Sequence, residues 1–123
     1  MILAFLQVAL GGAIGSAARY GVTLAAARMT GLPLGTLAVN VAGSFLMGLL
    51  AAILALRGNQ HLAPLLLTGI LGGFTTFSAF SLDTLTLWER GEAGLALAYV
   101  FGSVLLSLLA IIAGLAIGRI YFA

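Results

Sequence analysis

The sequence contains neither cysteine nor lysine. Without cysteine the chain has no disulfide bond, no thiol nucleophile and no cysteine-ligated metal site. Charge is also scarce, because charged side chains make up 7% of its 123 residues, against about 25% in a typical soluble domain. Its five cations are scattered arginines, so no basic cluster exists to bind the phosphates of a nucleic acid. No catalytic triad, pair of buried carboxylates, phosphate loop or cluster of metal ligands indicates an enzyme.

Hydrophobic residues, by contrast, make up 63% of the chain, and the mean hydropathy is +1.25. A helix needs roughly 20 apolar residues to cross a bilayer. We expect such spans at about residues 3–27, 34–56, 62–88 and 93–120. The first segment lacks the basic n-region of a cleaved signal peptide, so we interpret it as a retained span. The sequence thus predicts an all-α, multi-pass membrane protein with a single four-span domain over residues 1–123, surrounded by the lipid bilayer.

The arginines give these spans almost no preferred orientation. Cytoplasmic loops usually carry an excess of Lys and Arg. Here Arg57 and Arg119 fall on one side of the membrane, and Arg28 and Arg90 on the other. A chain without this bias is compatible with insertion in both orientations, and therefore with an antiparallel dimer. Four helices barely enclose a polar pathway, which also favours function in an oligomer.

Glycine pairs with the spacing of close helix contacts recur along the chain. We expect them to pack helices within one subunit, with a dimer seam as the alternative. The pairs are Gly11 and Gly15, Gly69 and Gly73, and Gly114 and Gly118.

The third span has an unusual centre, GILGGFTTFSAFS, at residues 69–81. Paired glycines and paired threonines are unfavourable in the middle of a regular helix. Irregular backbone at membrane depth persists only where protein, water or an ion satisfies its polar groups. We therefore expect a break at about residues 72–76, with free carbonyls available to a small hard cation. A glycine-rich packing kink is the open alternative.

Two aromatic rings follow this break. Phe77 and Phe80 share one helix face, and Ser81 and Thr84 continue that face. Because the edge of an aromatic ring is electropositive, two rings presented edge-on beside hydroxyl donors suit an anion. The alternative is that both rings pack against lipid or a neighbouring helix.

Other spans also carry polar residues. Thr36, Asn40 and Ser44 form a stripe on the second span. An intramembrane Asn usually faces the interior of the bundle, where it would donate to an anion or hydrogen-bond another helix. Ser103 and Ser107 share a face of the fourth span, as pathway donors or as hydroxyls bonded to their own backbone.

Two charged residues lie within the spans. Arg19 is close enough to the end of its span that we expect it to snorkel to the interface, with a functional role as the alternative. For Asp83 we expect either a place at the mouth of a polar pathway or a pairing with Arg19.

Three motifs in order resemble the Fluc/CrcB family of fluoride channels. They are GGAIGSAARY at 11–20, GTLAVNVAGSF at 35–45 and GGFTTFSAFS at 72–81, and the resemblance covers the whole chain. It implies a fluoride-selective channel that exports fluoride passively across the cell (inner) membrane. It also implies an antiparallel dual-topology homodimer with two fluoride pathways.

The resemblance further implies roles for particular residues. It implies a structural sodium ion at the dimer centre, held by the backbone carbonyls of Gly72 and Thr75, and no organic cofactor. Phe77 and Phe80 would be the rings that fluoride passes edge-on, and Asn40 the pore asparagine. Some members of the family carry Thr or Ser in place of Ala79. Ser78 would supply a hydroxyl of the fluoride pathway, and Arg19 would match the arginine of the family's first span. From the helix faces described above, rather than from the resemblance, we also expect Ser81, Thr84, Ser103 and Ser107 on the pathway.

Two other functions compete with this interpretation. A small proton-coupled drug antiporter can also be a four-span dual-topology dimer, but it needs a titratable group in the membrane. Only Asp83 qualifies here, and the first span has no Glu. A purely structural role in a larger assembly is the second alternative, and it predicts that Asn40, Phe77 and Phe80 can be replaced without loss of transport.

Overall fold

The computed structural model describes residues 1–123, all of them in helices, turns or short connections. Four helical segments are long and apolar enough to cross a membrane, which confirms the predicted all-α fold. Their bounds, which differ from the expected ones only at the ends, are Ile2–Ala27, Leu34–Arg57, Gln60–Glu89 and Ala93–Tyr121. The first, second and fourth are the helices α1, α2 and α5. The third consists of η1 (Gln60–Leu62), the π-helix η2 (Pro64–Leu71), α3 (Gly72–Phe74) and α4 (Phe77–Glu89).

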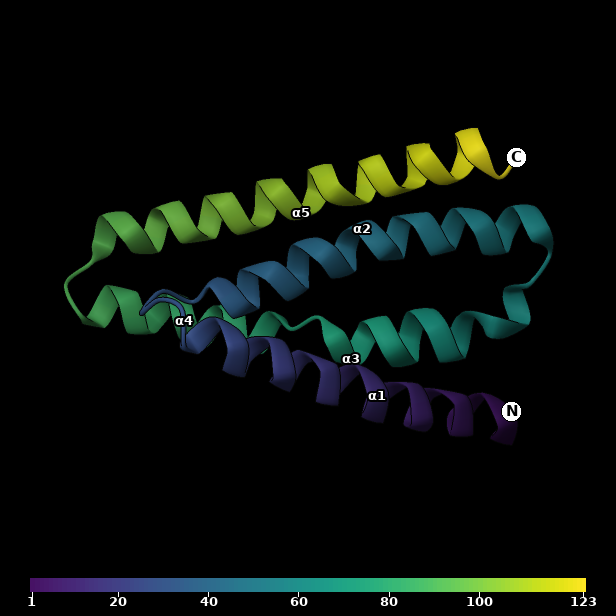
Figure 1. Cartoon of the computed structure of the whole chain (residues 1–123), viewed down its shortest axis with the longest axis horizontal. Coiled ribbons are helices and arrows are strands. Elements are labelled where there is room, and N and C mark those ends of the chain that lie inside the picture. The colour runs from purple at the N-terminus through teal and green to yellow at the C-terminus, as the bar shows by residue number, and fades with distance from the viewer.

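The spans run alternately up and down, so that both termini and the turn at η1 lie at one end of the molecule (Figure 1). The connections at 28–33 and 90–92 lie at the other end. Glycines with positive φ occur in the turns that follow α2 and α4, where Gly58 has φ 68° and Gly91 has φ 80°. Because side-chain-bearing residues rarely adopt this conformation, glycine allows each helix to end in a tight turn.

Two pairs of helices make most of the packing contacts: α1 lies against η2 and α3, and α2 lies against α5. Glycines bring both pairs close together. A Cβ on Gly69 would lie 2.9 Å from the Cα of Gly11, and a Cβ on Gly73 would lie 2.7 Å from the Gly12 carbonyl oxygen. A Cβ on Gly118 would lie 2.7 Å from that of Ala52. The expectation that these glycines pack helices within one subunit is therefore confirmed.

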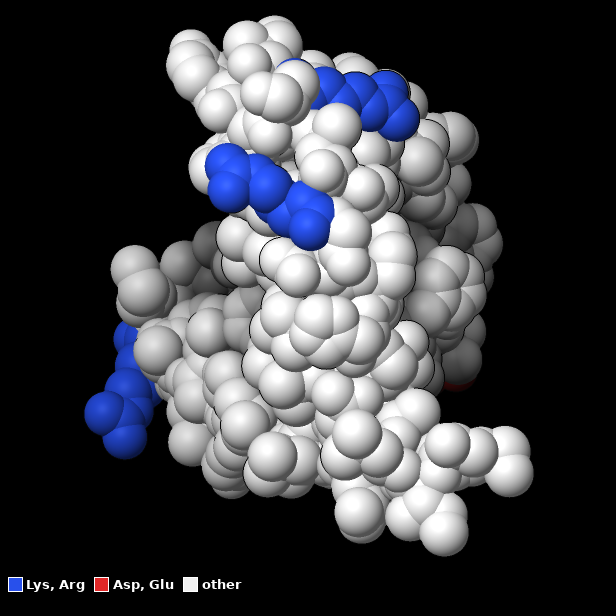
Figure 2. Space-filling model, turned by 90° about the vertical axis from the view of Figure 1, so that its right-hand side faces the viewer, with Lys and Arg blue, Asp and Glu red and all other residues white.

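Most of the surface of the bundle is apolar, and only 18 of the 123 residues are buried. Large apolar side chains such as Phe5, Phe101 and Leu109 are mainly exposed on the outer faces of α1 and α5. Figure 2 shows the end that carries both termini, where a few arginine side chains stand on an uncharged surface. A surface this apolar, with charges mainly near the ends, is typical of a bundle whose sides contact lipid.

The third span is broken at its middle, as predicted, but over fewer residues than expected. Thr75 and Thr76 have extended backbone, with ψ angles of 157° and 121°. Gly72–Phe74 remains a helical turn, because the Thr75 N–H donates to the Leu71 carbonyl at 3.0 Å. Thr76 then caps α4 by accepting the Ala79 N–H at 3.1 Å. The break therefore consists of two extended residues, Thr75 and Thr76, between two helical segments, and it is shorter than the break predicted at 72–76.

Candidate functional site

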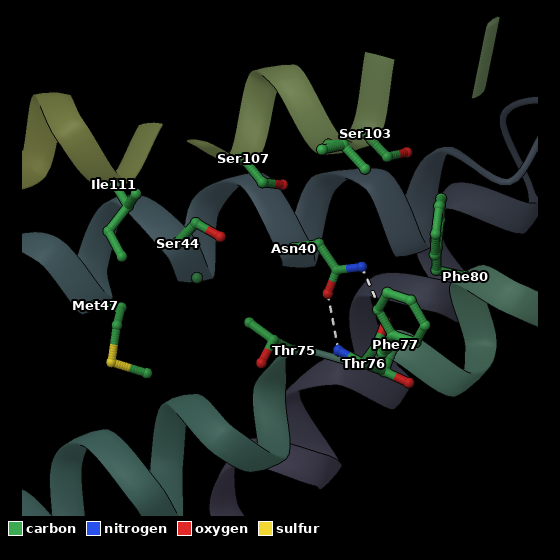
Figure 3. A pocket seen from close by; sticks show the side chains of 12 residues that line it. Asn40, Ser44, Met47, Thr75, Thr76, Phe77, Phe80, Ser103, Ser107 and Ile111 are labelled. Atoms are coloured by element: carbon green, nitrogen blue, oxygen red, sulfur yellow. Dashed lines mark hydrogen bonds between the residues drawn. The ribbon is translucent and has the colours of Figure 1, made fainter. Parts of the chain in front are cut away.

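A cavity of about 290 Å³ lies beside the break in the third span. Its wall combines Asn40 and Ser44 from the polar stripe of α2, the extended residues Thr75 and Thr76, the start of α4 and one face of α5 (Figure 3). Thr36, the third residue of the stripe, does not line it. Most of its polar residues belong to the motifs and helix faces expected from the sequence, and the structure brings them to one place. The lining residues are Asn40, Gly43, Ser44, Met47, Thr75, Thr76, Phe77, Phe80, Ser103, Val104, Ser107 and Ile111.

Asn40 joins α2 to the break by two hydrogen bonds. Its Nδ2 donates to the Thr76 carbonyl at 2.9 Å, and its Oδ1 accepts the Thr76 N–H at 2.8 Å (Figure 3). The amide side chain thus satisfies both polar groups of a backbone unit that has left the helix, as membrane depth requires. The interhelical hydrogen bond considered from the sequence is therefore present. An amide nitrogen carries two hydrogens, so Asn40 has a second donor at the cavity wall.

The break leaves particular carbonyls without their usual donors. In a continuous helix the Thr76 N–H would donate to the Gly72 carbonyl, but Asn40 accepts it instead. In the same way the Ala79 N–H, which would donate to the Thr75 carbonyl, is accepted by the Thr76 hydroxyl. Gly72 and Thr75, the two residues that the resemblance associates with a cation, are therefore among the residues whose carbonyls lose their helical donors at the break.

Arg19 reaches inward to the same break rather than outward to the interface. Its Nε donates to the Gly73 carbonyl at 3.0 Å, and the side chain is partly buried. The expectation that Arg19 snorkels to the interface is thus wrong, because a backbone carbonyl freed near mid-span offers a partner that the residue's position in the sequence does not reveal. Arg19 is not among the residues that line the cavity.

The two phenylalanines stand edge to face at the cavity wall. The ring centroids of Phe77 and Phe80 are 5.4 Å apart, and the ring planes meet at 60°. Phe80 is buried, with 8% of its surface exposed, and its ring also contacts that of Tyr99 at 5.4 Å. Phe77 is 77% exposed and projects from the bundle. The two rings therefore differ in their surroundings: neighbouring side chains cover Phe80, whereas Phe77 is open on the surface of the chain.

The hydroxyl groups fall into distinct environments. Ser103 Oγ is buried at the cavity wall and has no hydrogen-bond partner. Thr84 donates to the Phe80 carbonyl at 2.8 Å, and Ser81 donates to the Phe77 carbonyl at 3.0 Å. Both line a second cavity of about 400 Å³, which shares only Phe80 with the first. The remaining candidate, Ser78, lies 3.2 Å from the Thr76 hydroxyl and lines neither cavity.

Tyr99 is a polar residue of this region that sequence reasoning missed. Its hydroxyl donates to Asp83 Oδ2 at 3.1 Å, and its ring packs beside Phe80. Asp83 is therefore paired with Tyr99, so of the two alternatives considered for Asp83 the pairing with Arg19 is wrong. The tyrosine continues the face of Ser103 and Ser107 at four-residue intervals, which is the signal that could have identified it.

The chemistry of the first cavity is that of neutral hydrogen-bond donors and ring edges. It contains no charged side chain, and the chain has no group of three or more His, Cys, Asp or Glu residues that could hold a metal ion. An amide, serine and threonine hydroxyls and the electropositive edges of phenyl rings all favour an anion. Because none carries a full charge, such a site binds an anion weakly enough to release it.

A family model and several known proteins match nearly the whole chain, and the known proteins all carry the same name. The family model described as "CrcB-like protein, Camphor Resistance (CrcB)" matches residues 6–115. A protein of Paracoccus denitrificans (strain Pd 1222) named "Fluoride-specific ion channel FluC" is 73% identical over 120 residues, which cover 97% of both chains. A protein of the same name from Cereibacter sphaeroides (strain ATCC 17029 / ATH 2.4.9) is 60% identical over 121 residues, again covering 97% of each chain. The Agrobacterium fabrum (strain C58 / ATCC 33970) protein of that name is 52% identical over 119 residues, 94% of this chain and 95% of its own.

Proposed function

The chain belongs to the CrcB-like family, and from this premise we propose that it is a fluoride-specific channel through which fluoride leaves the cell passively. It is a multi-pass protein of the cell membrane and a channel rather than an enzyme. The structural observation that best supports the proposal is the cavity beside the broken span. Its wall contains both uncharged hydrogen-bond donors and the edge-to-face pair of Phe77 and Phe80.

This combination suits a small and strongly hydrated anion. Fluoride must exchange its hydration shell for other donors before it can enter a narrow path. Asn40 and Ser103 each have donor capacity at the cavity wall, because the second amide hydrogen of Asn40 and the hydroxyl of Ser103 are not used in protein hydrogen bonds. Phe77 and Phe80 contribute the electropositive edges of their rings to the same cavity wall. A lysine or a ring of arginines would bind the ion more tightly and slow its release.

The path that we propose runs from the face of Ser107 and Ser103, past Asn40, to the phenylalanine pair. It continues beyond Phe80 to Ser81 and Thr84. The support for this course is that Phe80 is the one residue that lines both cavities. Ser78 would contribute only after a change of side-chain conformation, and Arg19 would act from behind the break through Gly73.

A second copy of the chain would complete the pathway. Polar groups that face lipid at membrane depth are costly, and here a polar cavity and the exposed ring of Phe77 lie on the side of one subunit. A partner packed over this face would bury both. The nearly even distribution of arginine between the two ends is compatible with an antiparallel, dual-topology arrangement, which would give two equivalent fluoride pathways.

We further propose a structural sodium ion between the two copies, held by the carbonyls of Gly72 and Thr75. The support is that both carbonyls lose their helical donors at the break, and carbonyl oxygens are suitable ligands for a hard cation. The ion would supply a fixed positive charge at the centre of the dimer. The chain's own residues keep the carbonyls available, because Asn40 accepts the Thr76 N–H and Thr76 accepts that of Ala79.

Efflux from liposomes tests the proposal. Purified protein in vesicles loaded with equal concentrations of fluoride and chloride should release fluoride, with little chloride, once a potassium ionophore balances the charge. Chloride release at a comparable rate would contradict the proposed selectivity. Proton-driven uptake of a lipophilic cation, with no fluoride release, would instead support the antiporter.

A further inference from the structure

The acidic residues of this chain are confined to one part of the molecule. Asp83, Glu89 and Glu92 all lie on α4 or in the turn that follows it, away from both termini. The opposite end carries Arg57 and Arg119 and has no acidic side chain. The two ends therefore differ in net charge, although their arginines are almost equal in number.

The arginines at the two ends also differ in pairing: at the end with the acidic residues Arg90 is paired and Arg28 is not, whereas at the opposite end neither arginine is paired. Arg90 forms the one salt bridge of the structure, with Glu92 at 3.4 Å. Arg57 and Arg119 have no carboxylate partner, and each lies exposed in the last turn of its helix. The end that carries the termini thus presents two exposed guanidinium groups that form no salt bridge.

The two arginines are held near each other by the packing of α2 against α5. These helices run in the same direction and approach closely where a Cβ on Gly118 would lie 2.7 Å from that of Ala52. Farther along, the Arg57 guanidinium lies 6.0 Å from the centroid of the Phe122 ring. Arg119 is in the helical turn that leads to Phe122. One short stretch of surface therefore contains both guanidinium groups and an aromatic ring.

Apolar side chains surround these charges. Leu56, Ile120 and Tyr121 are all exposed beside the two arginines, with 76% of the Tyr121 surface exposed. Exposed aromatic and aliphatic side chains next to arginine at a span end are typical of the level of the lipid headgroups. At that level a phosphate lies within reach of the arginines while acyl chains contact the apolar side chains.

From this arrangement we propose that Arg57, Arg119 and Phe122 form a docking surface for the headgroup of an anionic phospholipid. Guanidinium groups bind phosphate oxygens through paired hydrogen bonds, and because neither arginine forms a salt bridge and no acidic side chain lies at this end, their charge is available to the lipid. The occupant is a lipid rather than a free anion, because the surface combines these charges with apolar side chains at membrane depth. The inference does not depend on the ion that the protein conducts.

Lipid binding by the purified full-length chain tests the inference. Native mass spectrometry of the protein in detergent would compare adducts with phosphatidylglycerol and with phosphatidylcholine of the same acyl composition. We expect a preference for phosphatidylglycerol that falls about tenfold or more in the double variant Arg57→Gln and Arg119→Gln. Arg90→Gln is the matched control, since its charge is already paired with Glu92, and it should keep the preference.

Several results would overturn the inference. These are equal binding of the two lipids by the unmodified protein, an unchanged preference in the double variant, or an equal loss in Arg90→Gln. Displacement of phosphatidylglycerol by soluble glycerol phosphate at similar concentrations would show that the surface binds a free anion and would also overturn it. Fluoride efflux from phosphatidylcholine vesicles, which should be unchanged in the double variant, checks that this variant is folded. If the double variant misfolds, the two single variants should each lose part of the preference.

Discussion

The side-chain amide of Asn40 and the backbone of Thr76 are joined by two hydrogen bonds of 2.9 and 2.8 Å, so α2 holds the unwound part of the third span in place. This pairing has two consequences. It makes an extended backbone unit tolerable inside the membrane, and it diverts the N–H that would otherwise satisfy the Gly72 carbonyl. Asn40 is therefore both part of the cavity wall and a support for the break.

Replacing Asn40 tests this double role. In Asn40→Asp the Thr76 N–H keeps its acceptor, but the Thr76 carbonyl loses its donor and a negative charge enters the cavity wall. We expect fluoride efflux to fall at least about tenfold. The repulsion between the carboxylate and fluoride and the loss of the hydrogen bond to the Thr76 carbonyl should each cost more than about 1 kcal/mol inside the membrane. Liposome efflux measures the loss. Asn59→Asp, at the polar turn after α2, is the matched control and should conduct normally; normal efflux in Asn40→Asp would show that the side chain is not part of the pathway.

The ring of Phe80 is the next test. Phe80→Ile keeps an apolar side chain in the core but removes the electropositive ring edge at the one residue that lines both cavities. Fluoride efflux should fall about tenfold or more, while size-exclusion behaviour stays that of the unmodified protein. Phe101→Ile, on the exposed face of α5, provides the control and should leave efflux unchanged. If Phe80→Ile conducts as well as the control, the ring edge has no role in conduction.

The Tyr99–Asp83 pair distinguishes a channel from a proton-coupled antiporter. Asp83→Asn keeps an oxygen that can accept the Tyr99 hydroxyl, so a channel should retain most of its fluoride efflux and its thermal stability. Tyr99→Phe leaves Asp83 without that donor and should destabilise the fold by about 1–2 kcal/mol, seen as a lower unfolding temperature in detergent. An antiporter that used Asp83 as its proton carrier would lose all transport in Asp83→Asn. That result would reject the channel mechanism.

The close packing of α5 against α2 at glycine predicts that a larger side chain there destabilises the protein. A side chain on Gly114 would collide with the Phe45 carbonyl of α2, and the Leu49 amide would be only 2.9 Å from its Cβ. Gly114→Val should therefore destabilise the protein by about 2 kcal/mol or more and reduce the yield of folded material. Gly94→Ala, in open space on the same helix, should be neutral or slightly stabilising. Equal stability of the two variants would contradict the close contact of α2 with α5.

The spans and the site differ in how far the sequence predicts them. Hydropathy predicts the spans, because a helix in lipid must be apolar along its length, and the Gly72–Thr76 composition predicts the break. The break is shorter than predicted because one backbone bond, from Thr75 to Leu71, preserves another helical turn. Periodicity likewise places Asn40 and Ser103 on the faces that meet at the cavity.

The direction of the charged and aromatic side chains was harder to predict. Arg19 turns inward to Gly73, and Asp83 pairs with Tyr99, because α3 and α5 bring a carbonyl and a hydroxyl to them. Such partners depend on how helices pack across long sequence separations, which no local pattern encodes. The same packing explains why Phe80 is buried and Phe77 exposed, although both share one helix face.

The reversal potential in a planar bilayer tests the central claim most directly. With the protein in the membrane, a fluoride gradient and equal chloride on both sides, we expect a reversal potential that follows the fluoride gradient. It should not move when chloride or pH is then changed on one side. A potential that tracks chloride or protons, or the absence of any fluoride current, would contradict the account that neutral donors and ring edges beside the broken span conduct fluoride.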